Sequence, residues 1–139
     1  MKIGKFLKES ILWENPDAEV LVETGDYGPC VEYNPATEIL THDEDKWVNE
    51  GAVLIDSDDD KPTMKVSELV DQLGKMDMKL EVEISDGYPA APFLISSYEE
   101  FAKHEQGRAG YPNGCTAVDE MKYFPNLKFP IIIIDTERV

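Results

Sequence analysis

The sequence is poor in bases, and this scarcity excludes two classes of function. Its 139 residues include 13 lysines and arginines against 29 aspartates and glutamates, a formal net charge of −16. Only Arg108 and Arg138 are arginines. A surface that binds nucleic acid needs bases to displace counterions, and an anionic membrane attracts basic segments. We therefore expect neither direct nucleic-acid binding nor attachment to an anionic membrane.

Cysteine and long apolar runs are also scarce. Two cysteines, Cys30 and Cys115, do not make a disulfide framework, so we expect reduced thiols and a cytoplasmic location. The longest apolar runs, such as Ile131 to Ile134, fall far below the roughly 20 residues of a membrane-spanning helix. Residues 1–13 lack an unbroken apolar stretch and a small-residue cleavage site, so no secretory signal peptide is expected.

What is present is the composition of a globular domain. Hydrophobic residues make up 42% of the chain. A chain of this length buries about 68% of its unfolded surface, so its core needs no metal or disulfide. No cofactor is predicted.

Two stretches of the sequence resemble each other. One begins at Met1 and the other at Met64, and both open with Met-Lys and a β-branched residue. Apolar residues then recur at helical spacing, at Ile3, Phe6, Leu7 and Ile11 and at Val66, Leu69, Val70 and Leu73. Gly4 and Ser67 occupy matching places that suit an N-cap. Alternating strand residues follow, and each half ends in an apolar run closed by an aspartate.

These patterns predict an α+β fold. We expect a tandem duplication of a helix-strand-strand-strand unit, with two main helices on a mixed or antiparallel sheet or on two packed sheets. The halves are residues 1–60 and 61–139, and the second carries an insertion at 97–128 that opens with a helix capped by Ser97 and Glu100. The second strands are matched as Cys30–Tyr33 and Pro92–Ser96. An α+β domain can also contain two such helices without any duplication.

The negative charge is concentrated in one third of the chain. Residues 14–60 hold fifteen acids and one base, Lys46. A field this one-sided steers basic partners, so we expect these carboxylates to gather on one exterior patch that occupies the basic surface of a nucleic-acid-binding or defence protein. The candidate contact residues are Asp43, Glu44, Asp45, Asp56, Asp58, Asp59 and Asp60. A solvated face that only aids solubility is the alternative. Association of the chain into a homo-oligomer is left open.

Three other motifs are weaker. Asp56, Asp58 and Asp60 open like a calcium loop, but Lys61 and Ser67 stand where an EF-hand needs glycine and glutamate. No metal site is therefore predicted. Cys115, His104 and Asp119 are the nearest approach to a nucleophile, base and orienting group, and their context matches no hydrolase signature, so no enzyme is predicted.

The glycine-rich loop at residues 107–114 supplies an alternative function. Arg108 can bind a phosphate with two hydrogen bonds, and Tyr111 can stack on a base. These contacts would make the protein a nucleotide-binding or nucleotide-sequestering protein. The glycine spacing fits neither a Walker loop nor a Rossmann turn.

The opening Met64-Lys65-Val66-Ser67-Glu68-Leu69-Val70, followed by Leu73, Leu80, Val82 and Ile84, resembles a pattern in small phage-encoded proteins. The start at Met1 is similar to it. The resemblance implies a small accessory protein of a phage or mobile element, and it transfers no functional residue. Together with the acidic segment, it leads us to expect an inhibitor of a host protein.

Overall fold

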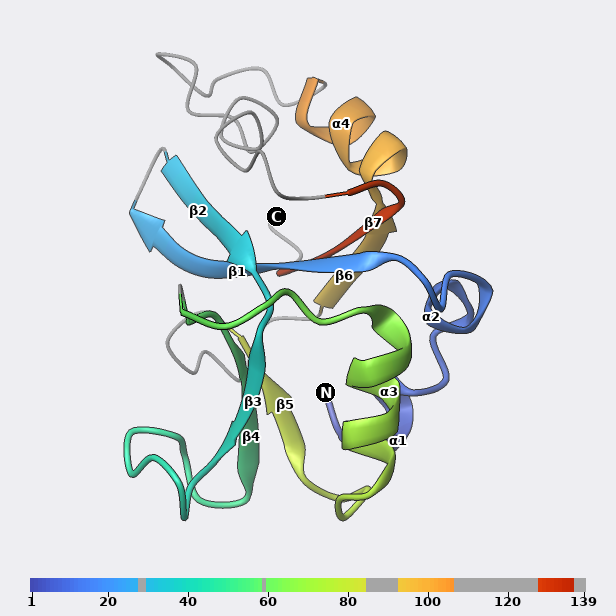
Figure 1. Ribbon diagram of the computed structural model, residues 1–139. Coiled ribbons are helices and arrows are strands. Elements are labelled where there is room, and N and C mark those ends of the chain that lie inside the picture. The colour runs from blue at the N-terminus through green and yellow to red at the C-terminus, as the bar shows by residue number, and fades with distance from the viewer. Residues whose placement is uncertain (28–29, 59, 85–92, 107–127, 137–139) are drawn as a thin grey trace.

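The protein has an α+β fold, as predicted, with strands in two sheets (Figure 1). The computed structural model describes residues 1–27, 30–58, 60–84, 93–106 and 128–136. The helices within these residues are α1 (Ile3–Phe6), α2 (Ser10–Glu14), α3 (Val66–Gly74) and α4 (Tyr98–Gln106). The strands are β1 (Glu19–Tyr27), β2 (Cys30–Pro35), β3 (Glu38–Thr41), β4 (Ala52–Asp56), β5 (Glu81–Glu83), β6 (Phe93–Ser97) and β7 (Ile131–Thr136).

Each sheet combines strands from both halves of the sequence. The four-stranded sheet has the order β2-β1-β7-β6, and the three-stranded sheet has the order β3-β4-β5. β1 is antiparallel to β2 and parallel to β7, whereas β4 is antiparallel to β3 and parallel to β5. Both sheets are therefore mixed, and residues 1–60 and 61–139 interlock instead of forming separate lobes.

The start of the first half is tied to β5 by backbone hydrogen bonds. The carbonyl oxygen of Met1 accepts the N–H of Val82 at 2.8 Å, and the carbonyl oxygen of Leu80 accepts the N–H of Ile3 at 2.9 Å. The chain thus enters α1 directly beside the strand that belongs to the other half.

The start of the second half makes the same contacts with β1. The carbonyl oxygen of Met64 accepts the N–H of Val20 at 3.1 Å, and the carbonyl oxygen of Ala18 accepts the N–H of Val66 at 2.8 Å. Each helix-strand opening of one half is thereby paired with that of the other. This reciprocity is what a duplicated chain with a pseudo-twofold axis would show, and the duplication itself stays a prediction.

The predicted match between second strands differs from the pairing in the sheets. β6 lies antiparallel beside β7, as β3 lies antiparallel beside β4. The triplet β6-β7-β1 therefore corresponds to β3-β4-β5, and β2 is an additional edge strand beside β1. The expected correspondence of Cys30–Tyr33 with Pro92–Ser96 is wrong in this respect.

The main core lies between the two sheets and the first three helices. Leu69 and Leu73 of α3 are fully buried in one cluster with Val20 of β1, Val53 of β4 and Ile132 of β7. The helical spacing of the apolar residues predicted this face of α3. The expected N-caps are wrong, because α1 and α3 begin at Ile3 and Val66 after Lys2 and Lys65, which make no side-chain cap bond.

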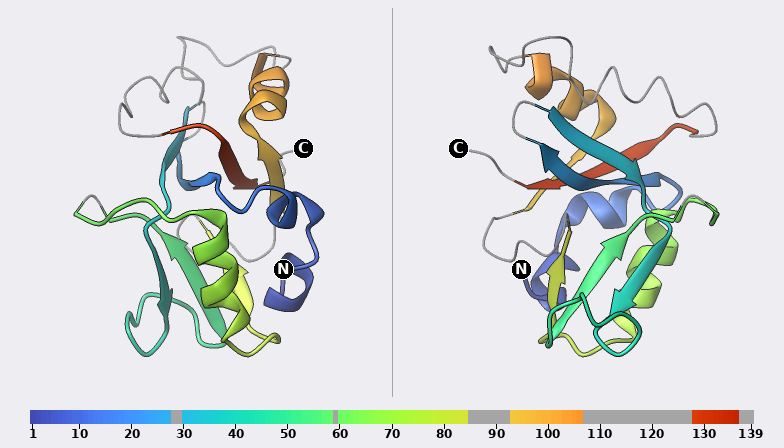
Figure 2. Two further views of the ribbon diagram at one scale, coloured as in Figure 1. Left: turned by 45° about the vertical axis from the view of Figure 1, so that its right-hand side comes forward. Right: turned by 90° about the vertical axis from the view of Figure 1, so that its left-hand side faces the viewer.

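The opposite face of the four-stranded sheet is covered by α4 (Figures 1 and 2). Phe101 of α4 is buried and packs edge-on against Tyr33 of β2, with ring centroids 5.3 Å apart. The hydroxyl of Ser97 accepts the N–H of Glu100 at 3.3 Å, which confirms the predicted helix start. None of the helices described here is long and apolar enough to cross a membrane.

Candidate functional site

Most of the predicted contact residues lie on one element, which we call the acidic hairpin. It comprises residues 38–61 and includes β3, β4 and the segments that follow each strand. Nine of its residues are acidic and two are lysines. Its tip is residues 42–51, which join the strands, and its base is residues 56–61, which follow β4. The hairpin lies at the lower left of Figure 1.

The tip is organised by hydrogen bonds among its own residues. The Thr41 hydroxyl donates to Glu44 Oε1 at 2.9 Å, and the Thr41 carbonyl accepts the N–H of Asp45 at 2.9 Å. His42 Nδ1 lies 2.6 Å from the carbonyl oxygen of Val48. These contacts close the tip into a compact turn, so the side chains at its surface have a defined direction.

The carboxylates of the tip face solvent. Asp43 and Glu44 are exposed, and Asp45, whose Oδ1 accepts the N–H of Trp47 at 2.9 Å, is half-buried. Lys46 lies 3.8 Å from Asp43 Oδ1, with both side chains exposed. An ion pair between such exposed groups contributes little, so the tip keeps its negative field.

Some charged groups at the base of the hairpin interact with neighbouring residues of the same chain. Asp58 Oδ1 accepts the N–H of Asp60 at 2.9 Å, and the Asp58 N–H donates to the Thr37 hydroxyl at 2.7 Å. Lys61 forms an ion pair with Glu38. The Lys61 ammonium group donates a hydrogen bond to this carboxylate, which raises the pKa of Lys61 above its ordinary value. Asp56 and Asp58 are half-buried and Asp60 is exposed, while Asp59 lies outside the described residues.

The two acidic runs lie at opposite ends of the hairpin. Thr41 is the partner of Val53 at the tip end, and Glu38 is the partner of Asp56 at the base end. About 10 Å of strand separates them, which is close to the screening length at physiological ionic strength. The runs therefore act as two neighbouring charged surfaces. The expectation that the carboxylates of residues 14–60 form a single exterior patch is wrong for Glu23, because this residue is 1% exposed.

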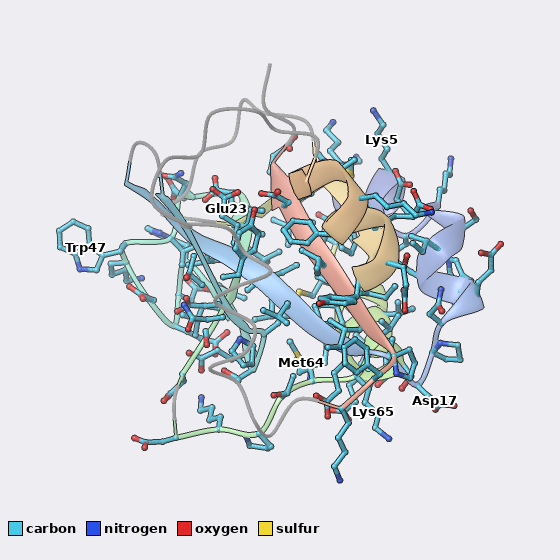
Figure 3. All side chains as sticks on the ribbon, turned by 90° about the horizontal axis from the view of Figure 1, so that it is seen from above. Lys5, Asp17, Glu23, Trp47, Met64 and Lys65 are labelled. Carbon is cyan, nitrogen blue, oxygen red and sulfur yellow. The ribbon has the colours of Figure 1, made fainter. Side chains whose placement is uncertain are left out.

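Glu23 belongs to a buried polar group that the sequence analysis missed. Glu23, which Figure 3 labels, is 1% exposed, as are Tyr33 and Asp135 on the same sheet face beneath α4. The Tyr33 hydroxyl donates to Asp135 Oδ2 at 2.7 Å. The signal was present in the chain: the unbroken run before Asp135 marks a strand buried on both faces, so a residue that continues it is buried too. The Ser96 hydroxyl on β6 is buried and has no hydrogen-bond partner within the residues that the structure describes.

A groove of about 470 Å³ lies between α2 and α3. Its lining is mostly apolar and includes Leu12, Val66 and Val70. The two charged residues in the lining, Asp71 and Lys75, form an ion pair with each other at 3.0 Å. Their opposite charges compensate each other, so the described lining of the groove has no net charge that would attract a charged ligand.

Several sequence-predicted groups lie outside the described residues. Arg108 and Tyr111, with the whole loop at 107–114, are among them, and so are Cys115 and Asp119. His104 lies on α4, but its side chain is not described. Within the described part of the chain, no three histidine, cysteine, aspartate or glutamate side chains are grouped so that they could hold a metal ion.

Comparison of the chain with protein families, curated proteins and solved structures gave no match. The resemblance to small phage-encoded proteins therefore stays a prediction.

Proposed function

We propose that the protein is a non-catalytic acidic binding protein whose hairpin occupies the basic surface of a partner protein. The observation that carries this proposal is the balance of charge on the acidic hairpin. Both of its lysines already lie beside carboxylates of the same hairpin, Lys46 beside Asp43 and Lys61 beside Glu38. The remaining carboxylates give it a negative field that attracts basic surfaces and repels nucleic acid.

A nucleic-acid-binding or defence protein is the class of partner that fits this field. Its basic surface is built to neutralise phosphates, and the carboxylates at the tip and the base of the acidic hairpin can take the place of those phosphates. Such an inhibitor needs no catalytic group. This role agrees with the accessory protein of a phage or mobile element that the sequence resemblance implies.

Capture from a bacterial lysate tests the proposal. The immobilised protein should retain nucleic-acid-binding proteins at about 50 mM salt and release them at about 500 mM salt, because salt screens exposed charges. Duplex DNA should compete for the same captured proteins.

A matched pair of variants makes the test specific. The hairpin variant neutralises four exposed acids as Asp43→Asn, Glu44→Gln, Glu50→Gln and Asp60→Asn. The control neutralises four exposed acids on other elements as Glu14→Gln, Asp17→Asn, Glu68→Gln and Glu99→Gln. Capture should fall sharply only for the hairpin variant. Equal capture by both variants would contradict the proposal, because the net charge of the two is the same.

A further inference from the structure

Trp47 is the most exposed large apolar side chain among the described residues. Its exposed fraction is 95%, and Figure 3 shows it pointing away from the rest of the molecule. Trp13, the other tryptophan, is 60% exposed, and its indole N–H donates to the carbonyl oxygen of Leu7. Among the described residues, Trp47 therefore has neither the burial nor the side-chain hydrogen bond that would make it part of the packed structure.

The backbone around Trp47 is fixed on both sides. Its N–H donates to Asp45 Oδ1 at 2.9 Å, and the next residue, Val48, is 2% exposed. Asn49 Nδ2 donates to Oε1 of the buried Glu83 at 2.9 Å, which ties the tip to β5. The fold thus fixes the backbone that presents the indole before any partner arrives, so less backbone conformational entropy is lost on binding.

The neighbours of Trp47 define the chemistry of what it can bind. Asp43, Glu44 and Glu50 are exposed on the same tip. The face of an indole attracts ammonium and guanidinium groups, and carboxylates accept hydrogen bonds from both, with arginine able to bind in a two-pronged way. Tryptophan is also enriched among the residues that dominate binding energy at protein interfaces.

We infer that Trp47 is the anchor of a docking surface for an arginine- and lysine-rich segment of a protein partner. Its indole stacks on a basic side chain while the carboxylates of the tip pair with the flanking ones. This inference rests on the proposed function and deepens it, because it assigns the contact to the tip of the acidic hairpin and names the residue that supplies the apolar part.

Charge complementarity selects this occupant over two others. A second copy of the chain has the same net charge of −16, so electrostatic repulsion opposes docking of the tip on another copy. Nucleic acid is repelled for the same reason. A basic protein segment meets both the indole face and the carboxylates with attraction.

Fluorine NMR of the full chain tests the inference. The protein is labelled with 5-fluorotryptophan, which gives one signal each for Trp13 and Trp47, and Trp13→Phe assigns them. The probe is an oligo-arginine peptide, with a neutral glycine–serine peptide of equal length as control. Binding of the arginine peptide should move the Trp47 signal and leave the Trp13 signal in place. This readout needs no substitution at Trp47.

Affinities measured by calorimetry complete the test. Trp47→Ala should weaken binding of the arginine peptide roughly tenfold, since a partly desolvated cation–aromatic contact corresponds to about that factor, whereas Trp13→Ala should leave it unchanged. An unmoved Trp47 signal together with equal affinity for Trp47→Ala would overturn the inference and leave the acidic-hairpin function standing. Absence of peptide binding to the unsubstituted protein at low salt would overturn both.

Discussion

The hydroxyl of Tyr33 and the carboxylate of Asp135, from residues 102 positions apart in the sequence, are joined by a buried hydrogen bond of 2.7 Å. Tyr33 lies on β2 and Asp135 on β7, with β1 between the two strands. This bond fastens three strands together on the face beneath α4. A buried carboxylate that loses a hydrogen-bond donor still carries the cost of its removal from water. Loss of this bond should therefore lower the free energy of unfolding by more than the net contribution of an ordinary hydrogen bond.

Tyr33→Phe should therefore lower the free energy of unfolding by about 1–3 kcal/mol, the cost of leaving a buried polar group less well satisfied. Urea denaturation measures the change. Tyr98→Phe is the matched control, because Tyr98 is half-buried on α4 and its hydroxyl has no hydrogen bond within the described part of the chain. Equal effects of the two substitutions would show that the Tyr33 hydroxyl does not stabilise the sheet.

Leu69→Ala should destabilise the protein by about 2–5 kcal/mol, because it removes a fully buried side chain and leaves a cavity in the main core. Glu68→Ala changes the neighbouring residue, which is exposed on the same helix, and should alter the free energy of unfolding by less than about 0.5 kcal/mol. Thermal or urea unfolding compares the two. A loss below about 1 kcal/mol for Leu69→Ala would contradict the assigned position of α3 in the core.

Gly51→Ala should cost about 1–2 kcal/mol, because Gly51 has a positive φ of 78° at the end of the hairpin tip. A Cβ atom there would meet nothing within 4 Å, so the cost comes from the backbone alone. Gly74→Ala at the end of α3 is the control, since a Cβ there also meets nothing and the backbone is not in the left-handed region. It should be neutral or stabilising, and both are measured by thermal unfolding.

The pKa of Lys61 should lie above its ordinary value in the folded protein, because its ammonium group forms a hydrogen bond with the Glu38 carboxylate. A raised folded-state pKa means that the ion pair contributes in full at neutral pH and is lost only as the pH rises through that pKa. NMR titration of the Lys61 side chain at alkaline pH measures the value. Glu38→Gln should lower the pKa of Lys61, and an unchanged titration would show that the pair does not form in solution.

Neither half of the chain should fold alone. A fragment of residues 1–60 lacks the partners of β1 and β4, which are β7 and β5 of the other half. Circular dichroism should show each fragment unfolded when alone. A mixture of residues 1–60 and 61–139 should fold, because the strands of both sheets are then present. A folded fragment of residues 1–60 would contradict the interlocked arrangement of the two sheets.

The sequence determined the local structure of this protein. The helical spacing of Val66, Leu69 and Leu73 predicts α3 and its buried face, and Ser97 with Glu100 predicts the start of α4. The α+β class follows because these signals act between residues a few positions apart. The concentration of acids in residues 14–60 was likewise visible in the chain.

Only the tertiary structure decided how these pieces meet. The order β2-β1-β7-β6 places Glu23 and Asp135 in the interior, and the turn between β3 and β4 of the other sheet leaves Trp47 in solvent. Pairing between distant strands depends on which faces bury the most apolar area together, and no short window of sequence contains that comparison. For the same reason, the structure places one acid of residues 14–60, Glu23, in the interior beneath α4 and exposes others, such as Asp43 and Glu44, on the acidic hairpin.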